Sequence, residues 1–307
     1  MDKRSTFLVA AVLVAALLVC GCTQTGTTTA EPPQTLRIAT TTSLYDTGLL
    51  DSLVPGFEKE HNAVVQIVSA GTGKAIEYGQ RGDVDILMVH DRAREDVFLA
   101  DGYGLNRRVI AYNYFVIVGP ESDPAGIAGM QPEEAFQTIY ALGTNGTDGV
   151  AFISRGDNSG THSKEKAIWK SAGYNYTEDI QNSGAWYIEA GKGMGDTLVM
   201  TNEKQAYTLS DIGTFLAYKG DLDLVALVDS GAILLNVYSV MEINPAMHAG
   251  VNTSIAQDWI NYMVSDDVQQ QIEVFGVAEY GQPLFFCASG KAETIGVPAG
   301  ECATPLA

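Results

Sequence analysis

The first half of the chain alternates short apolar runs with segments of helical periodicity. Three β-branched runs that end in small or polar residues predict buried strands: 36–40, 64–68 and 84–89. Segments with apolar residues at helical spacing follow them in turn: 49–61, 74–80 and 94–101. This β-α-β-α-β order predicts a parallel sheet with helices on both faces. Ligands bind such sheets at the carboxyl ends of the strands, where the helices begin.

The second half contains two long apolar runs with a further α/β unit between them. The long runs cover residues 109–118, closed by Gly119-Pro120, and residues 233–243. Shorter predicted elements lie between or after them: helices 132–142, 159–172, 195–204, 212–218, 254–264 and 267–274, and strands 151–154, 206–209 and 224–228. We expect an α/β protein with two lobes, a cleft and a double-strand hinge. Lobe I would take residues 35–112 and 238–307, and lobe II residues 113–237.

The N-terminus has the pattern of an export signal. Lys3 and Arg4 precede an apolar run over 7–19, which is shorter than the roughly 20 residues that span a bilayer as a helix. Gly21 directly before Cys22 resembles a lipoprotein cleavage site, so residues 1–21 are predicted to be a signal peptide and Cys22 to carry lipid. Residues 22–34 are then a flexible polar tether. The protein would be extracytoplasmic and anchored to the outer face of the cell membrane, and an ordinary secreted protein is the alternative.

Composition narrows the range of ligands. The chain has 18 Lys and Arg against 37 Asp and Glu, a net charge of −19. This excludes a nucleic-acid binder that depends on contacts with phosphates. An anionic ligand would have to be held by local hydrogen bonds and dipoles, because salt screens charge beyond about 8 Å.

Cysteine and histidine usage predicts a disulfide and no metal site. After removal of the signal and lipidation of Cys22, Cys287 and Cys302 are the remaining thiols. Two thiols in an oxidising compartment usually pair, so we expect a bridge between them. The four histidines are scattered without the spacing of zinc ligands.

Hydroxyl and glycine residues gather in four turns that follow predicted strands. The turns are Thr40-Thr41-Thr42-Ser43, Ser69 to Lys74, Ser154 to His162, and Thr208 to Asp211. Hydroxyls and main-chain amides at helix N-termini are neutral donors suited to an oxyanion, and Arg155 adds a planar charged fork. Helix capping alone explains any single turn, but four such turns favour a binding site. The predicted ligand-binding residues are Thr41, Thr42, Ser43, Ser69, Gly71, Thr72, Arg155, Ser159, Gly160, Thr161 and Thr208.

Two enzymatic interpretations fit the spacing less well. Gly71-Thr72-Gly73-Lys74-Ala75 lacks both the earlier glycine and the final hydroxyl of a P-loop. Asp157, Ser159 and His162 are the residue types of a hydrolase triad, but they crowd into one loop without a nucleophile elbow. We expect Asp157 to orient Arg155 and His162 to be a cap or helix-surface residue, with no catalytic residue and no cofactor. An extracellular hydrolase and a structural surface glycoprotein stay as distant alternatives.

At the level of motifs, the chain resembles the substrate-binding component of tungstate ABC importers. The resemblance lies in residues 154–165 together with 40–43. Further matches cover nearly the whole mature chain: 116–120, 123–127, 206–211 and 280–284. It implies a two-lobed periplasmic-binding-protein fold of type II, with two mixed sheets and flanking helices. It also implies a monomer that closes over tungstate and docks on a membrane permease driven by an ATPase.

The chemistry of the donors orders the candidate anions. Tungstate is a dianion with acceptor oxygens only, so a site made of donors fits it. Hydrogen phosphate carries a proton that needs an acceptor, and Asp85 and Asp157 are the obvious carboxylates. Molybdate is nearly the same size as tungstate. Tungstate therefore ranks first on the resemblance, molybdate second and phosphate third.

Overall fold

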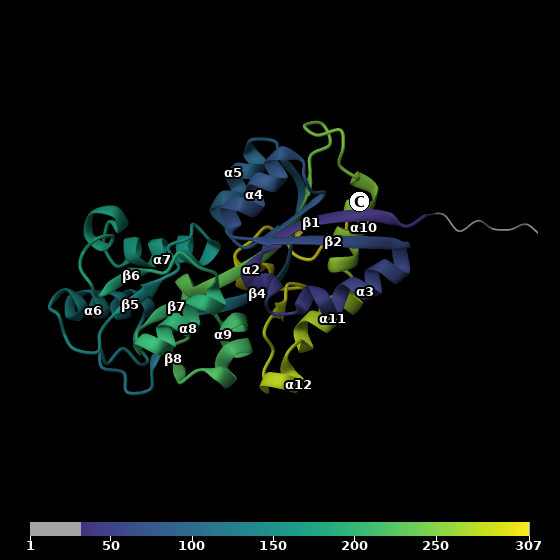
Figure 1. Ribbon diagram of the computed structural model, residues 1–307. Coiled ribbons are helices and arrows are strands. Elements are labelled where there is room, and N and C mark those ends of the chain that lie inside the picture. The colour runs from purple at the N-terminus through teal and green to yellow at the C-terminus, as the bar shows by residue number, and fades with distance from the viewer. Residues whose placement is uncertain (1–31, 307) are drawn as a thin grey trace, which may run out of the picture. The chain divides into compact units, whose positions relative to one another are not determined.

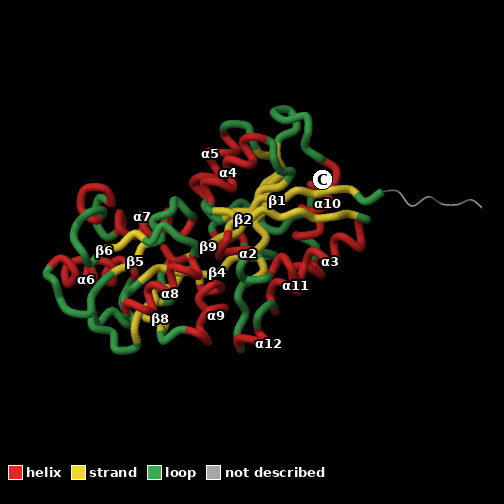
Figure 2. The backbone as a smooth tube through the Cα atoms, viewed as in Figure 1, coloured by secondary structure: helices red, strands yellow, loops and turns green. Residues whose placement is uncertain are grey.

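The computed structural model describes residues 32–306. The predicted signal peptide, the lipidation site Cys22 and most of the tether lie outside the described residues. From Pro33 onward the chain forms one compact unit. Figure 2 shows strands through the middle of this unit with helices around them.

The predicted β-α-β-α-β run is confirmed in the first part of the chain. Strands β1 (Gln34–Thr41), β2 (Ala63–Ala70) and β3 (Ile86–Val89) are parallel, with β1 in the middle. Helix α2 (Thr42–Tyr45) begins directly after β1 and is followed by α3 (Leu49–His61). Helix α4 (Thr72–Arg81) follows β2, and α5 (Arg92–Ala100) follows β3. The hydroxyl-rich turns therefore lie at the carboxyl ends of neighbouring strands.

The two long apolar runs are the long strands β4 (Gly104–Pro120) and β9 (Leu235–Ile243), which pair antiparallel. The first part of β4 also pairs with β10 (Phe286–Cys287), and its last part pairs with β7 (Thr208–Asp211) and β8 (Leu224–Val228). The fold class is α/β with mixed pairing, as predicted. Because β4 takes part along its whole length, the expected two mixed sheets are joined into one of eight strands.

The elements between β4 and β9 surround the second half of β4 (Figure 1). A separate parallel pair consists of β5 (Phe152–Ser154) and β6 (Tyr187–Glu189). The helices here are α6 (Pro132–Thr144), α7 (Gly160–Ser171), α8 (Met194–Lys204) and α9 (Ile212–Tyr218). The C-terminal part adds α10 (Thr253–Met263), which lies beside β1 and β9, and α11 (Asp266–Val274), which lies beside β4 and β10. Two short helices follow, α12 (Val277–Tyr280) and α13 (Ala292–Ile295).

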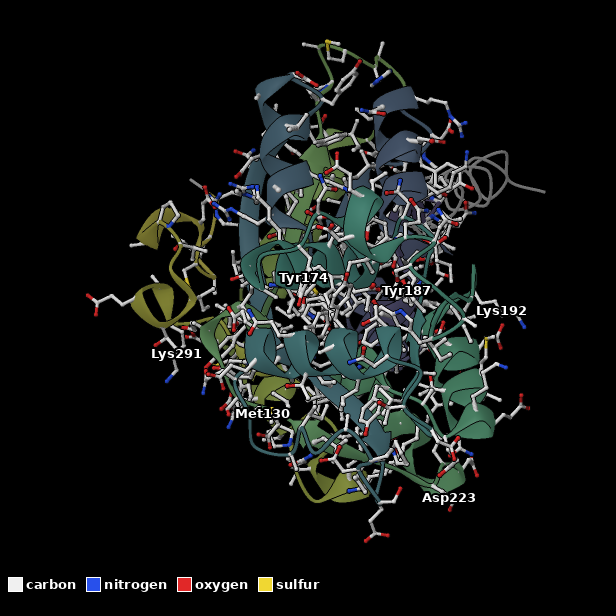
Figure 3. All side chains as sticks on the ribbon, turned by 90° about the vertical axis from the view of Figure 1, so that its left-hand side faces the viewer. Met130, Tyr174, Tyr187, Lys192, Asp223 and Lys291 are labelled. Carbon is white, nitrogen blue, oxygen red and sulfur yellow. The ribbon has the colours of Figure 1, made fainter. Side chains whose placement is uncertain are left out.

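Two large hydrophobic clusters stabilise the unit. The first core contains Phe57 and Trp259 and fills the space between the β1–β3 strands and helices α3 and α10. The second core contains Phe136 and Trp169 and lies under α6 and α7. Figure 3 looks toward this second region, where Tyr174 and Tyr187 are labelled. The hydroxyl-rich turns belong to strands and helices from both cores.

The predicted disulfide is wrong, because Cys287 and Cys302 are both free thiols. In the β-ladder, Cys287 lies opposite Ala111 of β4. Cys302 forms an isolated main-chain β-bridge with Val109, two residues away along the same strand. That offset corresponds to about 7 Å, near the upper limit for two bonded cysteines. The Cys302 thiol instead donates to the Ala288 carbonyl oxygen at 2.7 Å.

No helix within residues 32–306 is both long and apolar enough to cross a membrane.

Candidate functional site

The turns after β1, β2 and β5 meet at one place. Gly160, in the first turn of α7, approaches the other turns so closely that a Cβ there would lie 3.0 Å from Thr72 Oγ1 and 2.9 Å from His90 Cε1. Ser43, in the turn after β1, contacts the same His90 ring, with its Oγ 3.0 Å from Nε2. Three of the four predicted turns thus come together from both cores, and glycine is required at position 160 for this approach.

Arg155 is the central charged group of the site. Its side chain is 2% exposed, and its Nη2 contacts Asp157 Oδ2 at 2.5 Å. The predicted orienting role of Asp157 agrees with this contact. The Arg155 Nε is buried without any hydrogen-bond partner. A buried guanidinium N–H without an acceptor is costly, so this atom is ready to donate to an anion.

Several hydroxyl groups at the site are also buried without a partner. They are the Oγ1 atoms of Thr40, Thr42, Thr72 and Thr161. Together with Arg155 Nε they form a set of unused donors in the part of the chain that the structure describes. Buried polar groups are nearly always paired in folded proteins, so such a cluster indicates a place for a ligand.

Other predicted site residues have their polar atoms engaged. Thr41 caps α2 by accepting from the Leu44 N–H at 3.3 Å, and Ser159 caps α7 by accepting from the His162 N–H at 3.2 Å. The Thr208 hydroxyl donates to the Ile153 carbonyl oxygen at 2.6 Å. Capping leaves the Thr41 and Ser159 hydroxyl protons unassigned, whereas the Thr208 proton is committed to the main chain.

Ser69 and Gly71 lie after β2, at the end of the sheet order. Ser69 is exposed on this edge strand. Gly71 precedes α4 as its N-cap, and a Cβ there would lie 3.8 Å from the Asp157 carbonyl oxygen. The structure therefore brings Gly71 to the cluster and leaves Ser69 and Thr208 outside its set of free donors.

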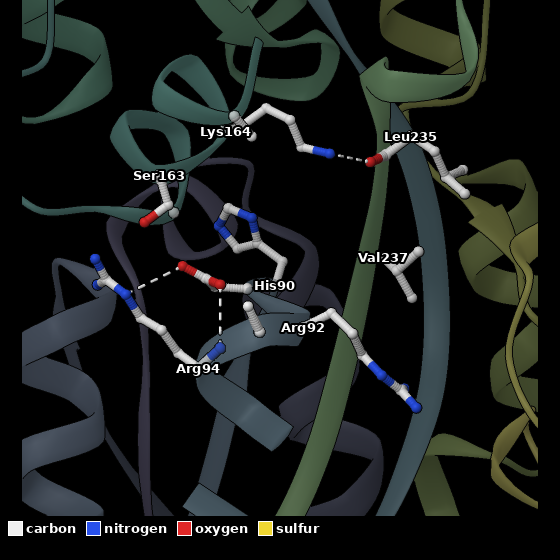
Figure 4. Close-up of a pocket in the computed structure, with 11 residues that line it drawn as sticks. His90, Arg92, Arg94, Ser163, Lys164, Leu235 and Val237 are labelled. Atoms are coloured by element: carbon white, nitrogen blue, oxygen red, sulfur yellow. Dashed lines mark hydrogen bonds and ion pairs between the residues drawn. The ribbon is translucent and has the colours of Figure 1, made fainter. Parts of the chain in front are cut away.

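A basic pocket of about 350 Å³ lies beside the cluster (Figure 4). His90 and Gly160 form part of its wall. Arg94 reaches from α5 to the loop before α7 and donates from Nη1 to the Asn158 carbonyl oxygen at 2.7 Å. Lys164 of α7 donates to the Leu235 carbonyl oxygen at 2.9 Å. These contacts connect α7 and its preceding loop with α5 and β9.

The structure does not assemble a catalytic triad from Asp157, Ser159 and His162. The Asn158 N–H donates to His162 Nδ1 at 3.1 Å, so the ring proton lies on Nε2, which contacts Tyr176 Oη at 2.8 Å. His162 is 5% exposed, so the expected helix-surface position is wrong, whereas its hydrogen bond from the Asn158 N–H, just before α7, agrees with the expected cap position. Burial lowers the pKa of His162 to about 4, and the ring is neutral at physiological pH.

A buried carboxylate supports the loop that carries Arg155. Glu165 accepts from Ser154 Oγ at 2.6 Å, Tyr187 Oη at 2.6 Å and Trp169 Nε1 at 3.1 Å. Burial raises the pKa of Glu165 to about 7, although the donors act in the opposite direction. This group lies behind the loop and fixes its position.

Sequence reasoning missed His90 as a residue of the site. It stands directly after β3, at the same edge of the sheet as the recognised turns, and is 7% exposed. Its Nε2 contacts Ser43 Oγ at 3.0 Å. The other turns were selected because polar residues directly follow a predicted strand. His90 also directly follows a predicted strand, so the same criterion would have found it.

Comparisons with known proteins agree with this fold. A family model described as the PBP superfamily domain matches residues 26–267. The chain is 38% identical to the tungstate-binding protein TupA of Peptoclostridium acidaminophilum, over 92% of this chain and 98% of the relative. The chain belongs to the tungstate-importer substrate-binding family within the PBP superfamily.

Solved structures support the same assignment. The tungstate ABC transporter structure from Geobacter sulfurreducens is 45% identical with a TM-score of 0.68, covering 77% of this chain and 96% of that one. The tungstate-binding protein TupA of Desulfovibrio alaskensis is 40% identical with a TM-score of 0.69, covering 83% and 98%. The relatives named TupA are described as binding proteins, which supports a role without catalysis for this chain.

Proposed function

We propose that this protein captures tungstate between two lobes, 35–112 with 238–307 and 113–237, and delivers it as a monomer to an ABC permease and its ATPase. The observation that carries the proposal is the buried cluster of unused donors around Arg155. The names of the relatives and solved structures point to tungstate as the anion. Because the net charge of the chain is −19, an anion has to be held by local donors such as those of the cluster.

The two carboxylates predicted as acceptors for a phosphate proton are both engaged, which favours an anion without a proton. Asp157 is occupied by Arg155 and by the Ser159 N–H, at 3.2 Å from Oδ1. Asp85, the other predicted acceptor, binds the Arg37 N–H and guanidinium and the Asn252 N–H. Hydrogen phosphate would therefore find no open carboxylate among these two. Tungstate and molybdate need none.

Calorimetric titration of the purified protein with tungstate, molybdate, sulfate and hydrogen phosphate tests the proposal. We expect binding of tungstate, with molybdate second and phosphate weakest. Elemental analysis for tungsten and molybdenum in the protein as purified provides an independent measurement. Binding of phosphate without binding of tungstate would show that the proposed anion is wrong.

We further propose that Cys22 is the lipidated first residue of the mature protein. The support is the Gly21-Cys22 junction after a short apolar run and the polar segment that follows. Intact-mass analysis of the membrane fraction should show a diacylglycerol-modified chain that starts at this cysteine. An unmodified N-terminus at another residue would exclude anchoring in this form.

A further inference from the structure

A continuous series of hydrogen bonds connects Ser43 with the main chain behind the site. His90 contacts Ser43 Oγ through Nε2 at 3.0 Å and Asn236 Oδ1 through Nδ1 at 2.9 Å. The Asn236 amide donates to Asn113 Oδ1 at 2.9 Å, and the Asn113 amide donates to the Leu284 carbonyl oxygen at 3.2 Å. All four side chains are buried, with residue exposures of 0–7%. We call this series the His90 relay.

The fixed end of the relay determines the direction of every bond. A carbonyl oxygen only accepts, so Asn113 presents its amide nitrogen to Leu284 and its oxygen to Asn236. Asn236 must then donate to Asn113 and accept from His90, which places the ring proton on Nδ1. The bare Nε2 can only accept, and the Ser43 hydroxyl therefore donates to it.

The contact of Ser43 with Thr41 is too long to commit a second proton. Ser43 Oγ and Thr41 Oγ1 lie 3.3 Å apart, beyond the usual length of an O–H···O hydrogen bond. Because the single Ser43 proton goes to His90, the Thr41 proton has no assigned acceptor. Thr42, between them, has no partner for its hydroxyl. The Thr42 hydroxyl is therefore free to donate to an anion, whereas the neighbouring Ser43 hydroxyl is not.

The surroundings of the ring keep it neutral. Asp91 precedes α5, Arg155 follows β5, and Lys164 lies on α7, while the Tyr238 ring of β9 packs at 4.9 Å. Burial is the largest cause that lowers the pKa of His90, to about 4, and both cations lower it further. The Asn236 hydrogen bond and Asp91 raise it without cancelling the effect of burial.

We infer that His90 is a positioning residue of the anion site, whose relay withholds the hydroxyl proton of Ser43 from the anion. This inference rests on the proposed function and refines it. Of the adjacent hydroxyls of Thr42 and Ser43, only that of Thr42 then serves the anion directly. The side-chain donors with an uncommitted proton become Thr40, Thr41, Thr42, Thr72, Ser159, Thr161 and Arg155.

The tautomer of His90 can be measured without any anion. The chain has four histidines, so ¹⁵N-histidine labelling gives a small set of imidazole signals. Variants that each lack one of His61, His162 and His248 assign the His90 signal by elimination. We expect a neutral ring with the proton on Nδ1 at every pH from 5 to 8. A neutral ring protonated on Nε2, or a titration within this range, would overturn the relay.

Binding measurements test the consequence for the anion. Ser43→Ala and Thr42→Ala remove adjacent hydroxyls from the same turn and serve as matched variants. With tungstate in calorimetry we expect about a twofold to threefold loss of affinity for Ser43→Ala and about tenfold or more for Thr42→Ala, with folding of each variant checked by circular dichroism. An equal or larger loss for Ser43→Ala would overturn the inference.

The two measurements separate the inference from the proposed function. If the unmodified protein does not bind tungstate while His90 shows the expected tautomer, the proposed function fails and the relay stands. If tungstate binds and the tautomer is the opposite one, the relay fails and the proposed function stands. The tautomer measurement uses no substitution in the relay, so it decides even if a turn variant does not fold.

Discussion

Removal of the Arg155 side chain should weaken tungstate binding more than removal of any single hydroxyl. The guanidinium is 2% exposed and its Nε has no partner, so it meets a bound dianion with little screening by water. Arg155→Ala also leaves the Asp157 carboxylate, whose side chain is 17% exposed, without its cation beside the anion. Loss of one partner of a buried charge pair costs about 2–5 kcal/mol, which corresponds to about thirtyfold to several thousandfold in affinity.

Further variants separate the contribution of the Arg155 charge from the cost of leaving the Asp157 carboxylate unpaired. Arg155→Lys should restore part of the affinity, because an ammonium keeps the charge but not the planar fork. Arg155→Ala with Asp157→Asn should bind more tightly than Arg155→Ala alone, because the unpaired carboxylate is then neutral. The control is Arg81→Ala, which removes the same charge from a side chain that is 53% exposed.

Calorimetry at about 0.15 M salt should detect less than a twofold change for the Arg81→Ala control, because exposed charges are screened there. Circular dichroism and thermal unfolding establish that each variant is folded. A folded Arg155→Ala protein with tungstate affinity within threefold of the unmodified protein would refute the site assignment.

Three other outcomes follow from the structure. His162 has a folded-state pKa of about 4, below its ordinary value, so its contribution to stability is present above about pH 6.5 and lost as the pH falls toward 4. Denaturant unfolding at these two pH values should show that the free energy of unfolding falls by about 3 kcal/mol more in the unmodified protein than in His162→Gln. Equal falls in the two proteins would contradict this. Arg94→Ala should speed tungstate dissociation about threefold to tenfold in stopped-flow measurements, because the contact between α5 and the loop before α7 is lost, and an unchanged rate would rule out a role in retention. Cys287 and Cys302 should both be alkylated in unfolded protein without reductant, and a linked peptide in mass spectrometry would disprove free thiols.

The order of elements was predictable because each strand and helix has a strong local signal. The run at 36–40 became β1, and the turn after it became α2, because β-branched residues and then a capping hydroxyl stand in sequence there. The position of Ser69 was not predictable in the same way. Whether a side chain after β2 faces a neighbour depends on strand order, and β2 is the last strand of its sheet.

The site was predictable as a set of turns but not as a set of free donors. Whether a hydroxyl is available depends on partners that are distant in sequence. Thr208 is engaged by Ile153, and Ser43 by His90. The predicted disulfide failed for the same reason, since the position of Cys302 depends on its pairing with β4.

The length of β4 has a mechanical consequence. Its first part pairs with β9 and β10, and its last part pairs with β7 and β8, so one unbroken backbone runs from the first core to the second. A ladder of hydrogen bonds resists sliding, because a shift by one residue would turn every buried side chain to the wrong face. Strain between the two cores is therefore taken up by bending of β4 and β9, not by sliding of one strand along the other. The register of these ladders shifts between Leu105 and Arg108, between Val109 and Ala111, and between Ile117 and Val118. Irregularities of this kind kink a strand locally, so they are the positions at which β4 departs from a regular strand.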